Sequence, residues 1–328
     1  MLTKQMFNNC IDVEINDGVY YPVRFSPKQF EFYRNHSEFV HIRALCTADI
    51  YFEFSTASET VSFSCTLDNF VRKFSSFDIY ENDEFIENIP FPGCPETVEI
   101  LYNKRRPGIS KISVYLPYHC RAGISNLNAE ITPVSETSAK KLKILAYGDS
   151  ITQGMFAEYP SFTYPSLISK HFNAGLINQG VGGMPFKKDS LDAELNYKPD
   201  IITVAFGTID LSETSNYDEI ITDMREYIRE LKRISGKSRV YIISTLNSPT
   251  LKLRLEKRNI LNREEWFKPF SDELKDACEE TGLNFINGSY LAPNLPEFYV
   301  SDGHPNAQGF LTYALNLVKH INTNKRNV

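Results

Sequence analysis

The hydrophobic positions in the first 132 residues form short runs that alternate with polar positions. Residues 50–54 (Ile-Tyr-Phe-Glu-Phe) and 61–65 (Val-Ser-Phe-Ser-Cys) carry an apolar side chain at every second position. This period is typical of a strand that buries one face. We expect strands at Val19–Phe25, Phe39–Cys46, Asp49–Ser55, Thr60–Leu67, Thr97–Tyr102 and Lys111–Pro117. Short strands separated by turn-forming residues predict an all-β sandwich or jelly-roll domain over residues 1–132.

Aromatic side chains are dense in this part of the chain. They include Phe30, Phe32, Tyr33, Phe74, Phe77 and Tyr80. A face that stacks on sugar rings would use such residues, and so would the core of any sandwich. Because large exposed apolar patches are the exception, we assign these rings to the core.

The pattern changes after a polar stretch at residues 133–141, which has no periodicity and which we interpret as a linker. From Leu142 to Val328, buried strands alternate with amphipathic helices. We expect strands at Lys143–Gly148, Asp200–Phe206, Arg239–Leu246 and Leu283–Ile286, and helices at Tyr217–Ile234, Trp266–Thr281 and Asn306–Ile321. Such alternation predicts an α/β domain over residues 142–328, a three-layer parallel sheet with helices on both faces.

Composition and charge exclude several classes of function. The 328 residues include 41 acidic and 35 basic ones, for a net charge of −6, and this balance argues against a nucleic-acid partner. The start of the chain lacks the apolar core of a signal peptide, and no later stretch is long enough to span a membrane. We therefore expect a cytoplasmic protein without a membrane partner. The six cysteines show no metal-site spacing, and we expect no metal and no cofactor.

One stretch presents a candidate nucleophile. Residues 148–154 (Gly-Asp-Ser-Ile-Thr-Gln-Gly) start at the glycine that ends the strand expected from Lys143. Gly148 permits a tight turn, which would place Ser150 at the carboxyl end of a central strand, where open α/β sheets bind ligands. A helix after the turn would supply backbone N–H groups that favour negative charge. The alternative is an ordinary turn whose serine caps a helix.

Three further motifs are expected at the same sheet edge. They are Asn-Gln-Gly-Val-Gly-Gly at 178–183, Phe-Gly-Thr-Ile-Asp at 206–210 and Ser-Asp-Gly-His-Pro-Asn at 301–306. Together with residues 148–154, their order and spacing resemble the SGNH hydrolases, also called the GDSL esterase family. The resemblance covers Leu142 to Ile321 and implies an SGNH, flavodoxin-like catalytic domain.

The resemblance assigns a role to each motif. It implies that Ser150 is the nucleophile, that His304 is the base, and that the backbone N–H groups of Ser150 and Gly183 form the oxyanion hole. The chemistry is consistent, because a serine hydroxyl is a weak nucleophile until a base takes its proton. Imidazole titrates near neutral pH and suits that task. Asp149 and Asn247 are our candidates for substrate binding.

Two positions depart from the family pattern. The third motif of the family carries an asparagine that donates to the oxyanion, and this chain has Ile209 there. The family also places an aspartate three residues before the histidine, where this chain has Ser301, with Asp302 only two residues before. Three arrangements are compatible with this difference. Asp302 bonds the imidazole from a loop that is one residue shorter, or a backbone carbonyl orients the ring in a Ser-His dyad. In the third, Asp302 is only a turn residue.

The N-terminal part also resembles the β-sandwich that precedes the hydrolase domain in some bacterial carbohydrate esterases. Residues 52–56 and 114–118 carry this similarity. It implies a serine esterase that removes small acyl groups, acetyl above all, from a small-molecule or oligosaccharide ester. The alternatives are a degenerate member that binds carbohydrate with little turnover, which Ile209 favours, and a lipid-ester acylhydrolase.

Overall fold

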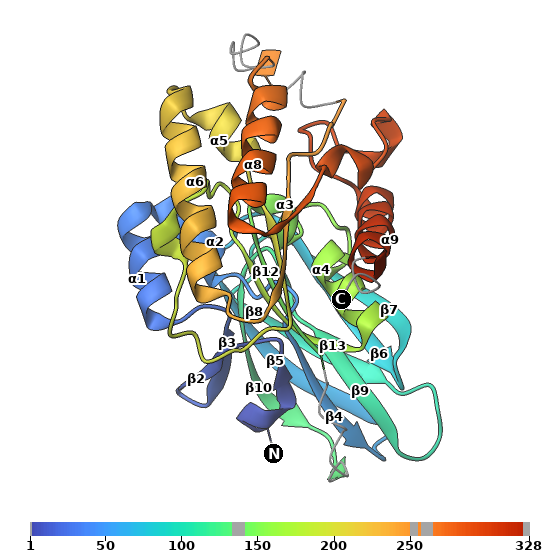
Figure 1. Cartoon of the computed structure of the whole chain (residues 1–328). Coiled ribbons are helices and arrows are strands. Elements are labelled where there is room, and N and C mark those ends of the chain that lie inside the picture. The colour runs from blue at the N-terminus through green and yellow to red at the C-terminus, as the bar shows by residue number, and fades with distance from the viewer. Residues whose placement is uncertain (1, 133–141, 250–254, 257–264, 324–328) are drawn as a thin grey trace.

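The chain folds into two antiparallel sheets followed by a parallel sheet with helices on both faces (Figure 1). The computed structural model describes residues 2–132, 142–249, 255–256 and 265–323. The polar stretch 133–141, predicted to be a linker, lies outside the described residues. In the described part of the chain, no helix combines the length and the apolar character needed to cross a membrane.

The N-terminal sheets form the predicted sandwich. One sheet has the order β1 (Phe7–Asn8), β4 (Tyr51–Thr56), β9 (Ser110–Tyr115), β6 (Phe74–Glu81) and β7 (Glu84–Pro92), with β11 (Ile131–Thr132) pairing with β4. The other has the order β2 (Asp12–Asn16), β3 (Val19–Val23), β10 (Arg121–Asn128), β5 (Thr60–Asp68) and β8 (Thr97–Asn103). Side chains such as Phe52, Phe63 and Phe77 fill the core of this part. Of the rings that the sequence assigns to the core, Tyr33, Phe77 and Tyr80 are buried, and Phe30 and Phe32 are partly buried. The assignment is wrong for Phe74, which is 48% exposed because it starts β6 at the surface, where its ring packs edge-on against His119.

The prediction that residues 1–132 are entirely β is wrong at one place. The expected strand Phe39–Cys46 is the helix α2 (Glu38–Leu45), and it follows the helix α1 (Pro27–His36). Ser26 and Gln29 form a capping box at the start of α1, and the Ser37 side chain accepts a hydrogen bond from the Val40 N–H. Val40 and Ala44, four positions apart, are the buried residues of α2, so the burial follows the helical period.

The C-terminal sheet is parallel throughout, with the order β13 (Ala174–Gly180), β12 (Leu142–Gly148), β14 (Ile201–Ala205), β15 (Arg239–Ile243) and β16 (Asn284–Ile286). In chain order this is 2-1-3-4-5, the flavodoxin-like arrangement, and the predicted three-layer fold is confirmed. The strand order reverses at β12. Ser150 follows β12, so it lies where such sheets bind ligands.

Helices cover both faces of the parallel sheet. One face packs against α6 (Tyr217–Ile234) and α8 (Phe267–Thr281), and the other against α4 (Tyr164–Phe172) and α9 (Ala307–Thr323). The helices predicted at Tyr217–Ile234, Trp266–Thr281 and Asn306–Ile321 are thus confirmed to within two residues at each end. Two short helices, α3 (Ser150–Gln153) and α5 (Thr208–Glu213), follow β12 and β14.

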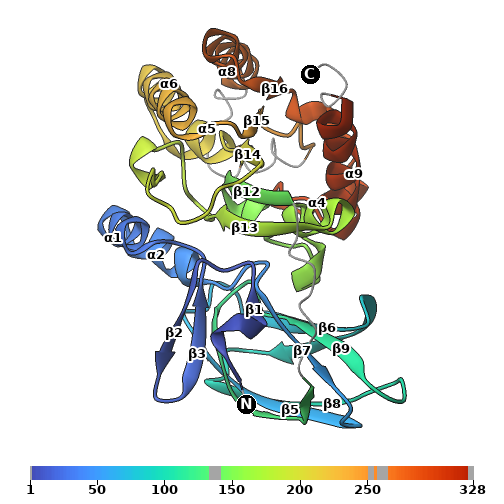
Figure 2. The ribbon, with the colours of Figure 1, turned by 60° about the horizontal axis from the view of Figure 1, so that its bottom comes forward.

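The two parts of the chain share a core. Figure 2 shows α1 and α2 beside the parallel sheet, above the sandwich from which they come. Tyr33, Val40 and Ala44 belong to the same buried cluster as Leu145 and Ile177 of the parallel sheet. The N-terminal part therefore contributes directly to the hydrophobic layer that supports β12 and β13.

Candidate active site

The turn after β12 is shaped by close packing. A Cβ at Gly148 would overlap the Thr152 side chain and lie 2.7 Å from the carbonyl oxygen of Ala205, so only glycine fits there. Asp149 is buried, and its Oδ1 accepts a hydrogen bond from the Ile151 N–H at 2.9 Å. Asp149 thus caps α3, and Ser150 is the first residue of that helix.

Ser150, His304 and Asp302 are joined by hydrogen bonds. Ser150 Oγ lies 2.6 Å from His304 Nε2, and His304 Nδ1 lies 2.7 Å from Asp302 Oδ1. Of the alternatives left open by the sequence, the structure shows the one in which Asp302 bonds the imidazole. The Asp302 side chain is 42% exposed, whereas that of His304 is 10% exposed. Asp302 Oδ1 also accepts the His304 N–H at 3.2 Å, so the same carboxylate shapes the turn.

The loop after β13 carries one of the two candidate oxyanion donors, Gly183; the other is Ser150, at the start of α3. Gly183 has a φ of +84° and lies directly under the ring of Phe39, which leaves no room for a Cβ. In the described residues, neither the Ser150 N–H nor the Gly183 N–H donates to another protein group. Both are therefore free to donate to a negative charge that develops next to Ser150.

Arg24, from the N-terminal part, holds this loop in place. It is buried, and its Nη1 donates to the carbonyl oxygens of Asn178 at 2.7 Å and Gly180 at 2.9 Å. Its Nε and Nη2 donate to the carbonyl oxygens of Cys46 and Arg43 near the end of α2. One guanidinium thus fixes the position of α2 relative to the glycine loop.

A cavity of about 710 Å³ opens in front of the serine. Its lining includes Ser150, Gly183, Ile209 and His304, so the structure brings these predicted positions together. Asn247 is exposed and is not among the described residues that line the cavity. The structure therefore does not place Asn247 with the other candidates.

Ile209 occupies the position where the family resemblance predicts an amide donor. It lies in α5, is 7% exposed and faces the cavity. A hydrocarbon side chain cannot donate a hydrogen bond. The Ile209 side chain thus forms an apolar part of the cavity wall. The candidate donors to an oxyanion near Ser150 are therefore backbone N–H groups.

The N-terminal part contributes cavity residues that sequence reasoning did not identify. Phe39, Arg43 and Arg72 line the same space as Ser150 and His304. Nothing local in the sequence connects these residues to the serine, because Arg43 and Ser150 are more than one hundred positions apart. The available signal was a pair of serines, Ser26 and Ser37, each at a position that caps the start of a helix. Recognising these caps would have predicted that Phe39 and Arg43 lie on a helix and not on a strand.

The loop after α3 brings an aromatic ring against the histidine. The Phe156 and His304 rings have centroids 5.3 Å apart. Phe156 has a φ of +68°, a conformation that is uncommon for a bulky side chain. Such strain is found more often at functional sites than elsewhere.

Asp210, the neighbour of Ile209 in α5, carries a buried carboxyl group. Its Oδ1 accepts the Phe186 N–H at 2.9 Å, and among the described residues no group bonds its Oδ2. Burial raises the pKa of Asp210 to about 7, and the nearby charge of Asp149 acts in the same direction. The folded protein therefore holds a proton on Asp210 at pH values where the unfolded chain does not.

Replacing Asp210 with Asn should change the dependence of stability on pH. Between the unfolded pKa of about 3.9 and the folded pKa of about 7, the folded state binds one more proton than the unfolded state. Wild-type stability should fall as pH rises through this window, by a few kcal/mol in order of magnitude, and level off above it. Asp210→Asn keeps the acceptor for Phe186 and has no proton to lose, so this contribution should disappear. Urea unfolding of both proteins at several pH values measures the difference; parallel curves would contradict the assignment.

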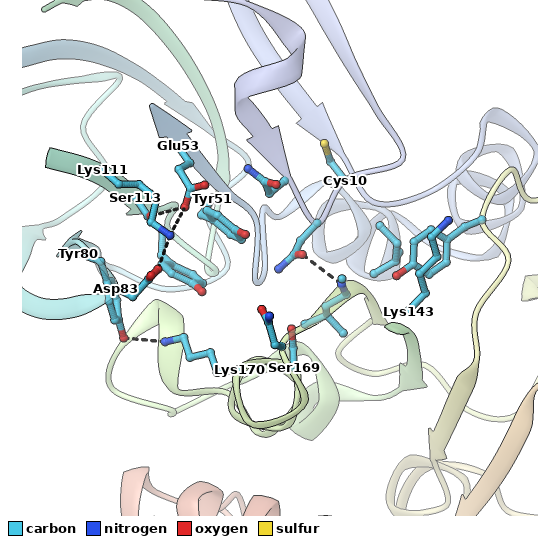
Figure 3. Close-up of a pocket in the computed structure, with 18 residues that line it drawn as sticks. Cys10, Tyr51, Glu53, Tyr80, Asp83, Lys111, Ser113, Lys143, Ser169 and Lys170 are labelled. Atoms are coloured by element: carbon cyan, nitrogen blue, oxygen red, sulfur yellow. Dashed lines mark hydrogen bonds and ion pairs between the residues drawn. The ribbon is translucent and has the colours of Figure 1, made fainter. Parts of the chain in front are cut away.

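A second crevice, of about 810 Å³, lies between the sandwich and the start of β13 (Figure 3). Its charged side chains contact one another or nearby polar groups. Lys111 pairs with Glu53 and Asp83, and Lys170 donates to the Tyr80 hydroxyl at 2.6 Å. The Lys170–Tyr80 contact joins the two parts of the chain, whereas the contacts of Lys111 lie within the sandwich.

Comparison with known proteins identifies related folds. A model of the GDSL-like lipase/acylhydrolase family matches residues 146–310. No curated protein is a significant match to the sequence. The matched range contains Ser150, Gly183 and His304. It also contains Ile209 and Ser301, the two positions that differ from the family pattern.

Solved structures match almost the whole chain at low identity. The salicylyl-acyltransferase SsfX3 from a tetracycline biosynthetic pathway has a TM-score of 0.77 and 15% identity, over 97% of this chain and 94% of that one. A family two carbohydrate esterase from Clostridium thermocellum, solved in complex with cellohexaose, has a TM-score of 0.65 and 12% identity, over 86% and 95%. An acetyl xylan esterase from the rumen bacterium Butyrivibrio proteoclasticus has a TM-score of 0.57 and 15% identity, over 84% and 90%. At these identities the likeness concerns the fold, including the β-rich part before the parallel sheet.

Proposed function

The chain belongs to the GDSL-like lipase/acylhydrolase family and is an esterase, and from this premise we propose that it removes small acyl groups, above all acetyl, from carbohydrate. The observation that carries the proposal is the chain of hydrogen bonds from Ser150 through His304 to Asp302. It pairs a nucleophile with a base and the base with an orienting carboxylate. The catalytic roles of the three residues are part of the proposal.

The geometry supports a two-step acyl transfer to water. Ser150 Oγ attacks the carbonyl carbon of the ester while its proton moves to His304 Nε2, 2.6 Å away. The N–H groups of Ser150 and Gly183 stabilise the negative oxygen of the tetrahedral intermediate. His304 then returns the proton to the departing alcohol oxygen, which leaves an acyl group on Ser150.

A water molecule completes the cycle. His304 takes a proton from the water, the oxygen attacks the acyl carbon, and the proton passes to Ser150 Oγ as the acid leaves. Asp302 stabilises the positive imidazole that forms in each step, through its 2.7 Å contact with Nδ1. The bonds formed and broken balance without any further reactant.

The residues that line the cavity support a substrate with both an apolar and a polar part. Nine of the fifteen residues that line it are histidine, serine, arginine, glutamate or aspartate. Its apolar residues are Phe39, Val40, Met155 and Ile209. This mixture fits a small acyl group next to a sugar better than a long hydrocarbon chain, which needs a mainly apolar site. The carbohydrate esterases with a similar fold give the proposal its substrate class.

A degenerate, carbohydrate-binding protein is the second candidate, and Ile209 is the residue that favours it. Release of acetate from acetylated xylan and from mono-acetylated sugars tests the choice. We expect release of acetate, and turnover of 4-nitrophenyl acetate at least as fast as that of the octanoate. Binding of these sugars without release of acetate would favour the degenerate protein. A strong preference for the octanoate would instead indicate a lipid-ester hydrolase.

The Ile209→Asn variant should be a faster esterase than the wild type. One oxyanion donor is worth on the order of a hundred- to a thousandfold in rate, and an amide at this buried position would face the cavity. We expect a gain smaller than that, about tenfold, because the surrounding side chains do not hold the new amide in place. Turnover of 4-nitrophenyl acetate measures the gain, with Ile209→Leu as the control for a change of shape. An unchanged rate for Asn would show that the backbone donors already suffice.

A further inference from the structure

Two arginines of the N-terminal part line the cavity that holds the candidate nucleophile. Arg43 lies on α2, and Arg72 lies on the segment between β5 and β6. Both side chains are partly buried. The mechanism proposed above uses neither of them.

Arg43 lies on the side of the glycine loop. Its guanidinium carbon is 3.3 Å from the centroid of the Phe39 ring, and its Nη1 donates to the Phe39 carbonyl oxygen at 2.8 Å. A Cβ on Gly182 would lie 3.3 Å from Arg43 Nε, so the side chain runs along the loop that carries Gly183. In the described residues, the N–H groups on Nε and Nη2 have no acceptor.

Arg72 lies on the side of the histidine. Its guanidinium carbon is 5.4 Å from the centroid of the Phe156 ring, and that ring contacts His304. Its Nη1 makes one long contact, 3.3 Å, to the carbonyl oxygen of its neighbour Val71. The two arginines thus line the same cavity as Ser150 and His304, Arg43 beside the glycine loop and Arg72 near the ring that contacts the histidine.

Neither arginine has a carboxylate partner within the described part of the chain. Other arginines of the protein do have one: Arg105, Arg106, Arg121, Arg225 and Arg233. Asp302, the acidic residue of the cavity nearest to the histidine, bonds His304 instead. Burial and the like charge of Arg72 together lower the pKa of Arg43 to about 10. Glu213 also lines the cavity, but no ion pair joins it or Asp302 to either arginine in the described residues. Two guanidinium groups thus lie in a partly desolvated site without a direct carboxylate contact.

We propose that Arg43 and Arg72 bind a carboxylate on the ester substrate, so that the preferred substrate is an anionic ester. Planar guanidinium groups, stacked on aromatic rings and with free N–H edges, suit two-point recognition of a carboxylate. The inference rests on the proposed function, because it names the class of ester that this site accepts. The carboxylate belongs either to the alcohol part, as in an acetylated acidic sugar, or to the acyl part, as in a half-ester of a dicarboxylic acid.

Matched pairs of esters that differ only in charge test the proposal. For the alcohol part the pair is 4-acetoxybenzoate and 4-acetoxybenzamide. For the acyl part it is 4-nitrophenyl hydrogen adipate and its amide. For one of the two pairs, we expect kcat/KM of the wild-type full chain to be at least about tenfold higher for the carboxylate than for the amide. A difference of this size corresponds to the free energy of one charge-assisted hydrogen bond. The pair that shows the preference identifies the part of the substrate that carries the charge.

Variants show whether the two arginines cause this preference. Arg43→Gln and Arg72→Gln should each reduce the ratio of the charged to the neutral ester, and the double variant should bring it near one. Arg34→Gln, which removes the same charge from an exposed position of α1, is the matched control and should keep the ratio. A wild-type ratio near one for both pairs, or a ratio that survives in the double variant, would overturn the proposal.

Two further readouts separate this inference from the proposed function. Calorimetric binding of the same four compounds to Ser150→Ala needs no turnover, and we expect the preferred carboxylate to bind about tenfold more tightly than its amide. Equal binding would overturn the anion site even if the protein hydrolyses both. If Arg43→Gln lowers kcat equally for charged and neutral esters and leaves their ratio unchanged, Arg43 acts on the oxyanion, and the proposal is again overturned.

Discussion

Replacing Ser150 with alanine will abolish ester hydrolysis and leave the fold intact. The Oγ of Ser150 contacts His304 Nε2 and carries no part of the hydrophobic core, so its loss removes the nucleophile without opening a large cavity. Loss of a serine nucleophile costs on the order of a millionfold in kcat in the best-studied serine hydrolase triads. We therefore expect the hydrolysis of 4-nitrophenyl acetate to fall to background, with an unchanged thermal unfolding curve.

A second serine of the same cavity provides the control for Ser150. Ser301 lines the cavity and is exposed, and the proposed mechanism gives it no role. Ser301→Ala should keep close to wild-type turnover. If Ser150→Ala also keeps it, the nucleophile is another group and the assignment fails.

Replacing His304 with alanine should cost nearly as much as the loss of Ser150. The two residues act as a unit, so the double variant Ser150→Ala/His304→Ala should be no slower than either single variant. Asp302→Ala should cost less, on the order of a hundredfold, because its carboxylate is 42% exposed and water can partly replace it at Nδ1. Steady-state kcat on 4-nitrophenyl acetate ranks the three losses.

The ranking distinguishes a triad from a dyad. An Asp302→Ala variant with undiminished kcat would make Asp302 a turn residue only, consistent with its contact to the His304 N–H. Equal losses for Asp302→Ala and His304→Ala would argue for a full triad. His320→Ala, on the last turn of α9, controls for the loss of a histidine elsewhere and should have wild-type kcat.

The sequence predicted the parts of the site that depend on local turns. The position of Ser150 is set by the tight turn at Gly148, two residues earlier, and the position of His304 is set by the turn before α9. The carboxyl ends of parallel strands share one edge of a sheet, so motifs from distant parts of the chain could be placed together in advance. The sequence could not show whether Asp302 bonds His304. Asp302 lies two residues before the histidine and not three as in the family, and a loop of either length is compatible with the sequence.

The contribution of the N-terminal part could not be predicted from local pattern. The stretch from Phe39 to Leu45, in which apolar residues outnumber His41 and Arg43, fits a strand as well as a helix, and the caps at Ser26 and Ser37 favour the helix. Arg24, Arg43 and Arg72 reach the site through tertiary packing, and such contacts leave no periodic signal in a sequence. Asn247 was a candidate because it follows the expected strand Arg239–Leu246, and the structure leaves it exposed.

The central claim is that Ser150 is a nucleophile activated by His304, and labelling with a fluorophosphonate tests it most directly. Only an activated serine reacts with this probe at an appreciable rate. The mass of the full chain should increase by one label, located on the peptide that contains Ser150, and the increase should be absent in Ser150→Ala and strongly reduced in His304→Ala. A wild-type protein that takes up no label, or takes it up on another residue, would contradict the account.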